Sequence, residues 1–236
     1  MGHYYFETAV LLRESVFLNG CLTNIEVCYG LTKENINTLE TLDKILLRKI
    51  LSSHSKVCSP SIWLELGLVP IRFLVMGRRV NFLYYILNRP HHDLLKKVFI
   101  VQEKYPVKND WVLTVKQDLE DLDIKLSFDE IKSLKKETFS KIVKDKVRTL
   151  AFRKLMEEKN TYSKMEKLQY TELKMQNYFV SHKINTKTAQ NIYCYRTRMA
   201  GVKVNFRSQF QDIMCLECKS EEDSQEHLLH HIQARS

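Results

Sequence analysis

Apolar residues recur at intervals of three and four along much of this chain, which is the spacing of a helix with one buried face. The clearest case covers residues 32–51, where Thr32 is a candidate N-cap. The apolar positions that follow the cap are Ile36, Leu39, Leu42, Leu46 and Ile50. Residues 4–22 and 135–159 show a similar pattern, and Arg13 falls among the charged positions of the first of them. The pattern therefore predicts amphipathic helices in all three segments.

Local start and stop signals predict further helices. Ser59 and Pro60 suit the cap and the first turn of a short helix, and Gly67 suits its end. Residues 70–89 begin with a proline and are apolar nearly all round, so much of this helix is expected to be buried.

The second half of the chain carries similar signals and no convincing strand pattern. Ser127 and Glu130 have the spacing of a capping box. Residues 187–202 are expected to form the last long helix, and no segment alternates apolar and polar residues as a half-buried strand would. The predicted fold class is therefore all-α, a multi-helix bundle.

Composition supports a helical protein with a substantial core. Among 236 residues, 44% are apolar, which is enough for one large domain or two small ones. The chain has only six glycines and four prolines, too few for the many turns of an all-β protein. We expect a helical region over residues 1–205 and a small Cys/His zinc-knuckle-like module over residues 206–236.

The chain is basic, which favours polyanionic partners. Its formal net charge is +9, with a sequence pI of about 9.2. The residues expected to contact RNA or DNA phosphates, without sequence preference, are Lys135, Lys136, Lys141, Lys144, Arg148, Arg78 and Arg79. Of these, Lys141, Lys144 and Arg148 share one face of the predicted helix over residues 135–159. The alternative is that these cations are merely solvated on a helix surface and bind no partner.

The C-terminal tail has the residue types and spacings of a zinc site. Two residues separate Cys215 from Cys218, and three separate His227 from His231, which places both histidines on one face of a helix. We expect these four side chains to hold Zn²⁺, with His230 as a competing fourth ligand. The alternative is a polar tail in which the cysteine pair is incidental.

Motifs of the common enzyme classes are absent from the sequence. It contains no glycine-rich phosphate loop, no Gly-x-Ser-x-Gly elbow and no His-Glu-x-x-His. The acidic groups at residues 119–123 and 221–223 are expected to be solvated charges. We therefore expect no catalytic residues and no small-molecule substrate.

The N-terminal residues show no secretory signal, and no stretch approaches the about 20 apolar residues of a membrane span. We expect no membrane partner. The cysteine usage does not suggest a disulfide scaffold, so a reducing compartment, cytoplasm or nucleus, is expected.

Four segments taken in order resemble the C-terminal part of non-LTR (LINE-like) retrotransposon polyproteins. They are residues 4–51, 63–87, 108–122 and 215–229, and the most recognisable piece is the Leu-Glu-Leu-Gly-x-x-Pro-Ile-Arg stretch from Leu64 to Arg72. In that family a helical thumb-and-connector region and a Cys-Cys-His-Cys zinc knuckle follow the reverse transcriptase palm. The aromatic-Ala-Asp-Asp turn of the palm is absent from this sequence.

The resemblance implies a fragment that holds RNA or DNA and does not polymerise it. Cys215, Cys218 and His227 match the first three knuckle ligands, whereas His231 stands where the family has its last cysteine. Two alternatives remain at this point. The chain is a helical scaffold retained by a host to bind a protein, or it is one part of a complete RNA-directed DNA polymerase.

Overall fold

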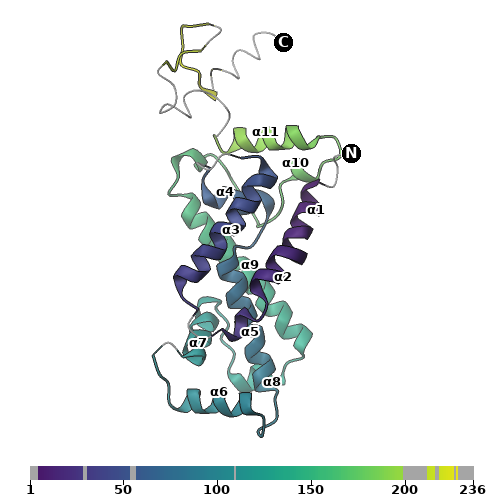
Figure 1. Cartoon of the computed structure of the whole chain (residues 1–236), viewed down its shortest axis with the longest axis vertical. Coiled ribbons are helices and arrows are strands. Elements are labelled where there is room, and N and C mark those ends of the chain that lie inside the picture. The colour runs from purple at the N-terminus through teal and green to yellow at the C-terminus, as the bar shows by residue number, and fades with distance from the viewer. Residues whose placement is uncertain are drawn as a thin grey trace. The chain divides into compact units, whose positions relative to one another are not determined.

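The computed structural model describes residues 5–28, 31–53, 57–108, 110–198, 212–215, 218–225 and 227. Over these residues the chain is helical, which confirms the all-α prediction (Figure 1). In the same residues the only extended pairing consists of two isolated antiparallel bridges, Leu66 with Met175 and Met214 with Glu222.

The chain forms two compact units, each assembled from separate stretches of sequence. Unit 1 comprises residues 1–9, 45–67 and 157–236, and unit 2 comprises residues 10–44 and 68–156. The predicted boundary at residue 205 lies outside the described residues. Unit 1 therefore combines the tail with residues from the N-terminal end and the middle of the chain.

Unit 2 is organised around α5 (Ile71–Leu87), whose residues are buried along most of its length, as its all-round apolar sequence predicts. Figure 1 shows α9 (Lys136–Lys159) beside α5, and a Cβ atom at Gly77 would lie only 2.9 Å from Val147 Cγ2 of α9. The other helices of this unit are η1 (Arg13–Leu18, a π-helix), α2 (Asn19–Leu22), η2 (Ile25–Val27), most of α3 (Lys33–Leu51), α6 (Leu94–Lys104), α7 (Trp111–Asp121) and α8 (Phe128–Ser133).

The single helix predicted over residues 4–22 is interrupted, and Arg13 is not on its polar surface. Helix α1 (Tyr5–Leu12) gives way to the π-helix η1, which begins at Arg13. The Arg13 guanidinium is almost fully buried and donates two hydrogen bonds of 2.6 Å to the carboxylate of Asp43. A helical-periodicity argument assigns charged residues to solvent, so it cannot anticipate a charge that is neutralised by a residue thirty positions away.

Most of the predicted helix starts are confirmed. Thr32 Oγ1 accepts a hydrogen bond of 3.2 Å from the Asn35 amide at the start of α3. Ser127 and Glu130 form the complete capping box of α8. The prediction for Ser59 is wrong, because α4 (Ser59–Leu66) begins at that residue and Cys58 is its N-cap.

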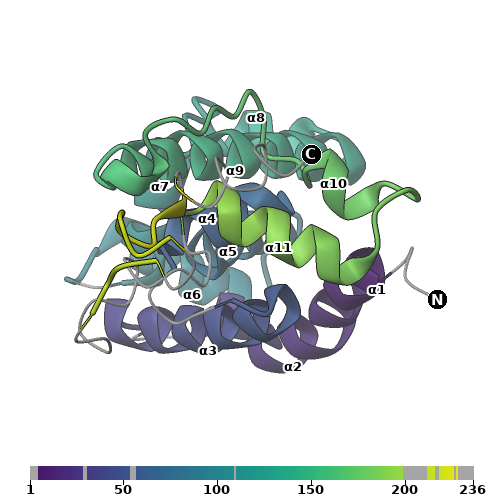
Figure 2. The ribbon, with the colours of Figure 1, turned by 90° about the horizontal axis from the view of Figure 1, so that it is seen from above.

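Unit 1 is built around α4, which is buried almost completely. Its largest side chain, Trp63, is 1% exposed. Around it lie η3 (Ser163–Met165), α10 (Asn177–Val180), α11 (Thr186–Arg196) and the first residues of α1. Phe6 of α1 packs against Phe179 of α10 with ring centroids 4.5 Å apart, and Figure 2 shows α1 and α10 close to α11. Helix α11 ends at Arg196. Within the described residues, the last long helix is therefore shorter than the predicted residues 187–202.

None of the described helices is by itself long and apolar enough to cross a membrane. In the part of the chain that the structure describes, α4 and α5 reach the length and hydropathy of a span only when the two are counted together.

Gly67 ends α4 in a conformation that only glycine adopts readily. Its φ of 66° lies in the left-handed region, as predicted for a helix stop. A Cβ atom at this position would overlap the backbone of Lys174 and Met175, which the Leu66–Met175 bridge holds against the helix end. The residue therefore allows two backbone segments of unit 1 to touch.

We predict that Gly67→Ala lowers the free energy of unfolding by about 2 kcal/mol or more, because backbone strain and overlap with a fixed backbone act together. Gly20→Ala is the matched control. Gly20 is helical, exposed and has no neighbouring atom within 4 Å of an added Cβ, so this change should stabilise the chain by about 0.5–1 kcal/mol. Urea unfolding followed by circular dichroism measures both. Equal effects of the two substitutions would contradict the assignment.

Candidate metal centre and the buried Glu65 network

The described part of the C-terminal tail forms a tight hairpin that brings its two cysteines near its histidine. Met214 and Glu222 form an antiparallel bridge. Next to it, the Cys215 amide donates a hydrogen bond of 2.8 Å to the carbonyl of Glu221. This pairing fixes the first cysteine beside the residues that lead to His227.

Two hydrogen bonds from backbone amides hold the turn after Cys218. The Lys219 amide donates to the Cys215 carbonyl at 3.0 Å, and the Ser220 amide points at the Cys218 sulfur, with N and Sγ 3.5 Å apart. Lys219 has a φ of 57°, which reverses the chain direction in this turn. Both bonds orient the backbone around the cysteine pair without using the side chain of Lys219.

Cys215, Cys218 and His227 form a group that could hold a metal ion. The two sulfurs and one ring nitrogen of His227 all lie within 4.8 Å of one another. Cys218 Sγ and His227 Nε2 lie 3.3 Å apart. Cys215 and His227 are buried, and Cys218 is half-buried. Soft thiolates and an imidazole in such a cluster are the ligands that zinc prefers.

Glu221 orients the imidazole of His227. Its Oε2 atom lies 2.8 Å from His227 Nδ1, so the opposite ring nitrogen, Nε2, faces the sulfurs. Such a carboxylate–histidine pair is a common outer-shell feature of metal sites. A hydrogen bond to Cys215 raises the pKa of His227, burial lowers it, and the bond to Glu221 raises it again, so the net direction is upward. Ser224 Oγ accepts a hydrogen bond of 3.0 Å from the His227 amide.

Sequence reasoning missed Glu221, which was expected to be a solvated charge. The side chain is mostly exposed, and only the hairpin pairing brings it onto the histidine. The predicted fourth ligand, His231, and its competitor His230 lie outside the described residues.

The predicted nucleic-acid residues fall into two groups. Along α9 and at its start, the exposed ones are Lys135, Lys136, Lys141, Lys144 and Arg148. The opposite face of α9 is buried through Phe139, Val143, Val147 and Leu150. One face of α9 therefore presents a row of cations to solvent.

Arg78 and Arg79 do not belong to this row, because both are engaged inside unit 2. Arg79 is 8% exposed and bonds both carboxylate oxygens of Asp118, at 2.6 and 2.9 Å. Burial raises the pKa of Asp118, and the bonds from Arg79 oppose that shift. Arg78 donates to the Leu22 carbonyl at 2.7 Å and is half-buried. The structure therefore gives Arg79 an internal role in place of the expected phosphate contact.

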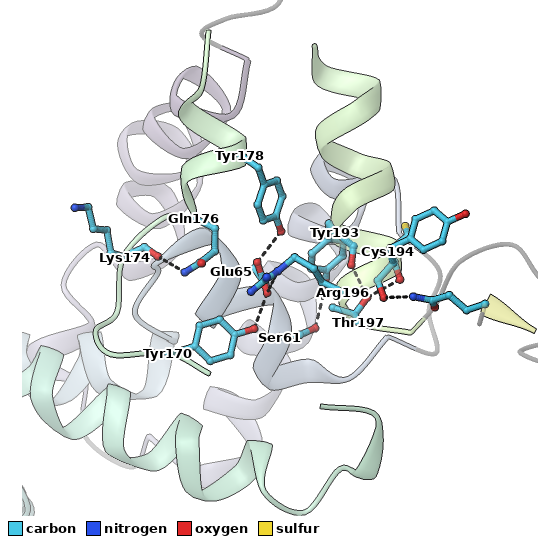
Figure 3. A network of polar contacts seen from close by, with 12 residues as sticks. Ser61, Glu65, Tyr170, Lys174, Gln176, Tyr178, Tyr193, Cys194, Arg196 and Thr197 are labelled. Carbon is cyan, nitrogen blue, oxygen red and sulfur yellow. Dashed lines mark hydrogen bonds and ion pairs between the residues drawn. The ribbon is translucent and has the colours of Figure 1, made fainter. Parts of the chain in front are cut away.

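A second cluster of polar side chains surrounds Glu65 in unit 1 (Figure 3). The Glu65 side chain is fully buried and accepts hydrogen bonds of 2.6 Å from Tyr170 and Tyr178 and of 3.0 Å from Arg196 Nε. Burial, and then the Glu65 charge, raise the pKa of both tyrosines, so both hydroxyls remain donors. The carboxylate therefore joins α4 to α10, α11 and the loop before α10.

Several residues of the stretch from Leu64 to Arg72, the most recognisable piece of the family resemblance, have structural roles in these contacts. Leu64 is fully buried, Glu65 carries the polar network and Gly67 permits the close backbone contact. In unit 2, Pro70 is the N-cap of α5, and Arg72 bonds Glu40 at 2.9 Å. Each of these contacts is structural, so the stretch needs no ligand to account for its composition.

Comparison with known protein families gives no match, and searches of the curated proteins and of the solved structures give none either.

We predict that Glu65→Gln lowers the free energy of unfolding by about 2–4 kcal/mol, because the amide cannot accept from three donors and leaves Arg196 without a countercharge. Glu172→Gln is the control, since Glu172 is 68% exposed and its nearest partner, Lys174, is 3.8 Å away. That change should alter stability by less than about 0.5 kcal/mol. Urea unfolding of both variants measures the difference. A Glu65 variant as stable as the control would show that the network is dispensable.

Proposed function

We propose that this chain is a non-catalytic nucleic-acid-binding fragment that resembles the C-terminal part of a non-LTR retrotransposon reverse transcriptase and carries one zinc ion in its tail. The convergence of Cys215, Cys218 and His227 is the observation on which the proposal chiefly rests. It supports the resemblance because these are the three positions that match the family's knuckle. A non-catalytic role is proposed because the sequence lacks the aromatic-Ala-Asp-Asp turn of the palm.

The residues present suit zinc. Zinc–sulfur bonds are about 2.3 Å long and zinc–nitrogen bonds about 2.0–2.1 Å long, so donor atoms within 4.8 Å of one another can share one ion after small shifts. Glu221 already fixes the ring of His227 with Nε2 toward the sulfurs. A bound zinc ion would cross-link the hairpin and stabilise a segment with a small core. His231 remains the proposed fourth ligand, in place of the family's last cysteine.

The exposed face of α9 is the proposed contact with the phosphate backbone. Lys141, Lys144 and Arg148 are spaced at i, i+3 and i+7 and are exposed. Cations in such a row contact phosphates without reading bases, so the binding is proposed to be tolerant of sequence. The proposed ligand is RNA or DNA.

We predict that purified protein binds one Co²⁺ with the visible spectrum of tetrahedral thiolate coordination, and that Zn²⁺ displaces it. Cys215→Ser, His227→Ala and His231→Ala should each abolish the tetrahedral spectrum. His230→Ala is the control and should preserve it. Because both thiols must lose protons, metal affinity should also fall as the pH is lowered. A wild-type chain without this spectrum and without stoichiometric zinc would refute the metal site.

We predict that replacing Lys141, Lys144 and Arg148 with glutamate weakens binding to a labelled RNA or DNA oligonucleotide by at least about tenfold at low salt, because the row of cations becomes a row of anions. Binding by the wild-type chain should fall steeply as the salt concentration rises. Fluorescence anisotropy measures both effects.

The control for this experiment is a triple variant with the same change in net charge, Lys167→Glu, Lys183→Glu and Lys187→Glu, at exposed positions outside α9. Both variants should retain the wild-type circular dichroism spectrum. If the two lose affinity equally, net charge governs binding and α9 is not the contact surface.

A further inference from the structure

Helix α6 of unit 2 presents an apolar stripe to solvent. Leu94, Val98, Val101 and the C-cap residue Tyr105 follow one another at intervals of four, three and four, which places them on one side of the helix. Their exposed fractions are 76%, 46%, 58% and 62%. A contiguous row of large exposed apolar side chains on a folded unit is typical of an interaction surface.

An open groove of about 170 Å³ runs beside this stripe. Val98 belongs to both the stripe and the groove, and the other walls include Phe82 and Ile86 of α5, Phe99 of α6 and Trp111 of α7. Helices α5, α6 and α7 pack at the same end of unit 2 (Figure 1). We call the stripe and the groove together the α6 surface. A groove of this size accommodates one large apolar side chain.

The charges around the α6 surface are predominantly positive. Of the acidic residues of α6 and its N-cap, Asp93 pairs with Arg89 at 3.1 Å and Glu103 lies 3.8 Å from Lys116. The exposed cations of the segment are Lys97, Lys104 and Lys108. An occupant that complements this surface is therefore apolar at its centre and acidic at its edges.

We propose that the α6 surface binds an acidic amphipathic helix of a partner protein. Apolar residues at i, i+3 or i+4, and i+7 of that helix would pack on the stripe and enter the groove, and its carboxylates would pair with Lys97, Lys104 and Lys108. This function goes beyond nucleic-acid binding, because the side chains at the centre of the surface are predominantly apolar and do not suit a phosphate.

The shape and charge of the surface disfavour two other occupants. A membrane surface accepts a protruding apolar face, whereas Phe82 and Trp111 line a recess beside the stripe. A second copy of the chain would bring its own Lys97, Lys104 and Lys108 against the same three cations. Like charges facing one another across an interface are unfavourable.

The test uses the full chain and a fluorescein-labelled, tryptophan-free peptide of about 18 residues, long enough for an amphipathic helix, with leucines at helical spacing and glutamates on both flanks. The expected result is saturable binding that shifts the tryptophan emission of the chain, in which Trp111 lines the groove and Trp63 is buried in unit 1. Val98→Glu should weaken this binding at least tenfold, because it places in the apolar groove a negative charge that repels the glutamates of the peptide. Leu42→Glu is the matched control, since Leu42 is 47% exposed against 46% for Val98, and it should change binding less than twofold.

Several outcomes would overturn the proposal. They are the absence of saturable binding, equal binding of a peptide with the same composition in scrambled order, and equal binding by Val98→Glu. Val98-dependent binding to phosphatidylcholine–phosphatidylserine vesicles without peptide binding would identify a membrane surface instead. A concentration-dependent dimer that Val98→Glu abolishes would identify a second copy as the occupant.

Discussion

The buried carboxylate of Glu65 is the interaction on which unit 1 depends. A charge removed from water is tolerated only where its lone pairs are satisfied, and Glu65 meets that condition through two tyrosine hydroxyls and one guanidinium. All three donors lie more than 100 residues further along the chain, at Tyr170, Tyr178 and Arg196. A single side chain of α4 thereby connects three separate segments of the C-terminal part of the unit.

Unit 2 uses arginine in the same way. Arg13 with Asp43 and Arg79 with Asp118 are buried pairs with two short bonds each, a geometry that the planar guanidinium favours. Each pair is neutral and contributes nothing to the net charge of +9. The positive excess therefore resides on other residues, and the exposed row on α9 is the part of it that we propose binds nucleic acid.

The sequence predicts the features that depend on near neighbours and misses those that depend on distant ones. The helix from Lys33, its cap at Thr32 and the Ser127–Glu130 capping box are encoded within a few residues, so periodicity and capping rules identify them. The burial of Arg13 requires Asp43, and the π-helix that begins there leaves no mark in the apolar spacing. The burial of Arg13 and the π-helix both depend on tertiary packing.

In the candidate metal centre, too, some residues could be predicted from local sequence and others could not. Cys215, Cys218 and His227 are recognisable from their spacing, and the structure brings them together. Glu221 is not recognisable, because an acidic residue in a polar tail is usually solvated and only the hairpin places it on His227. The grouping of residues into two discontinuous units was likewise unpredictable, since it follows from contacts between segments far apart in the chain.

Zinc K-edge X-ray absorption on the purified full chain tests the proposed metal site most directly, because it reports the ligand atoms themselves. Coordination by Cys215, Cys218, His227 and His231 predicts two sulfur neighbours at about 2.3 Å and two imidazole nitrogens at about 2.0–2.1 Å. A first shell of oxygen and nitrogen alone, or a spectrum unchanged when both cysteines are replaced by serine, would contradict it.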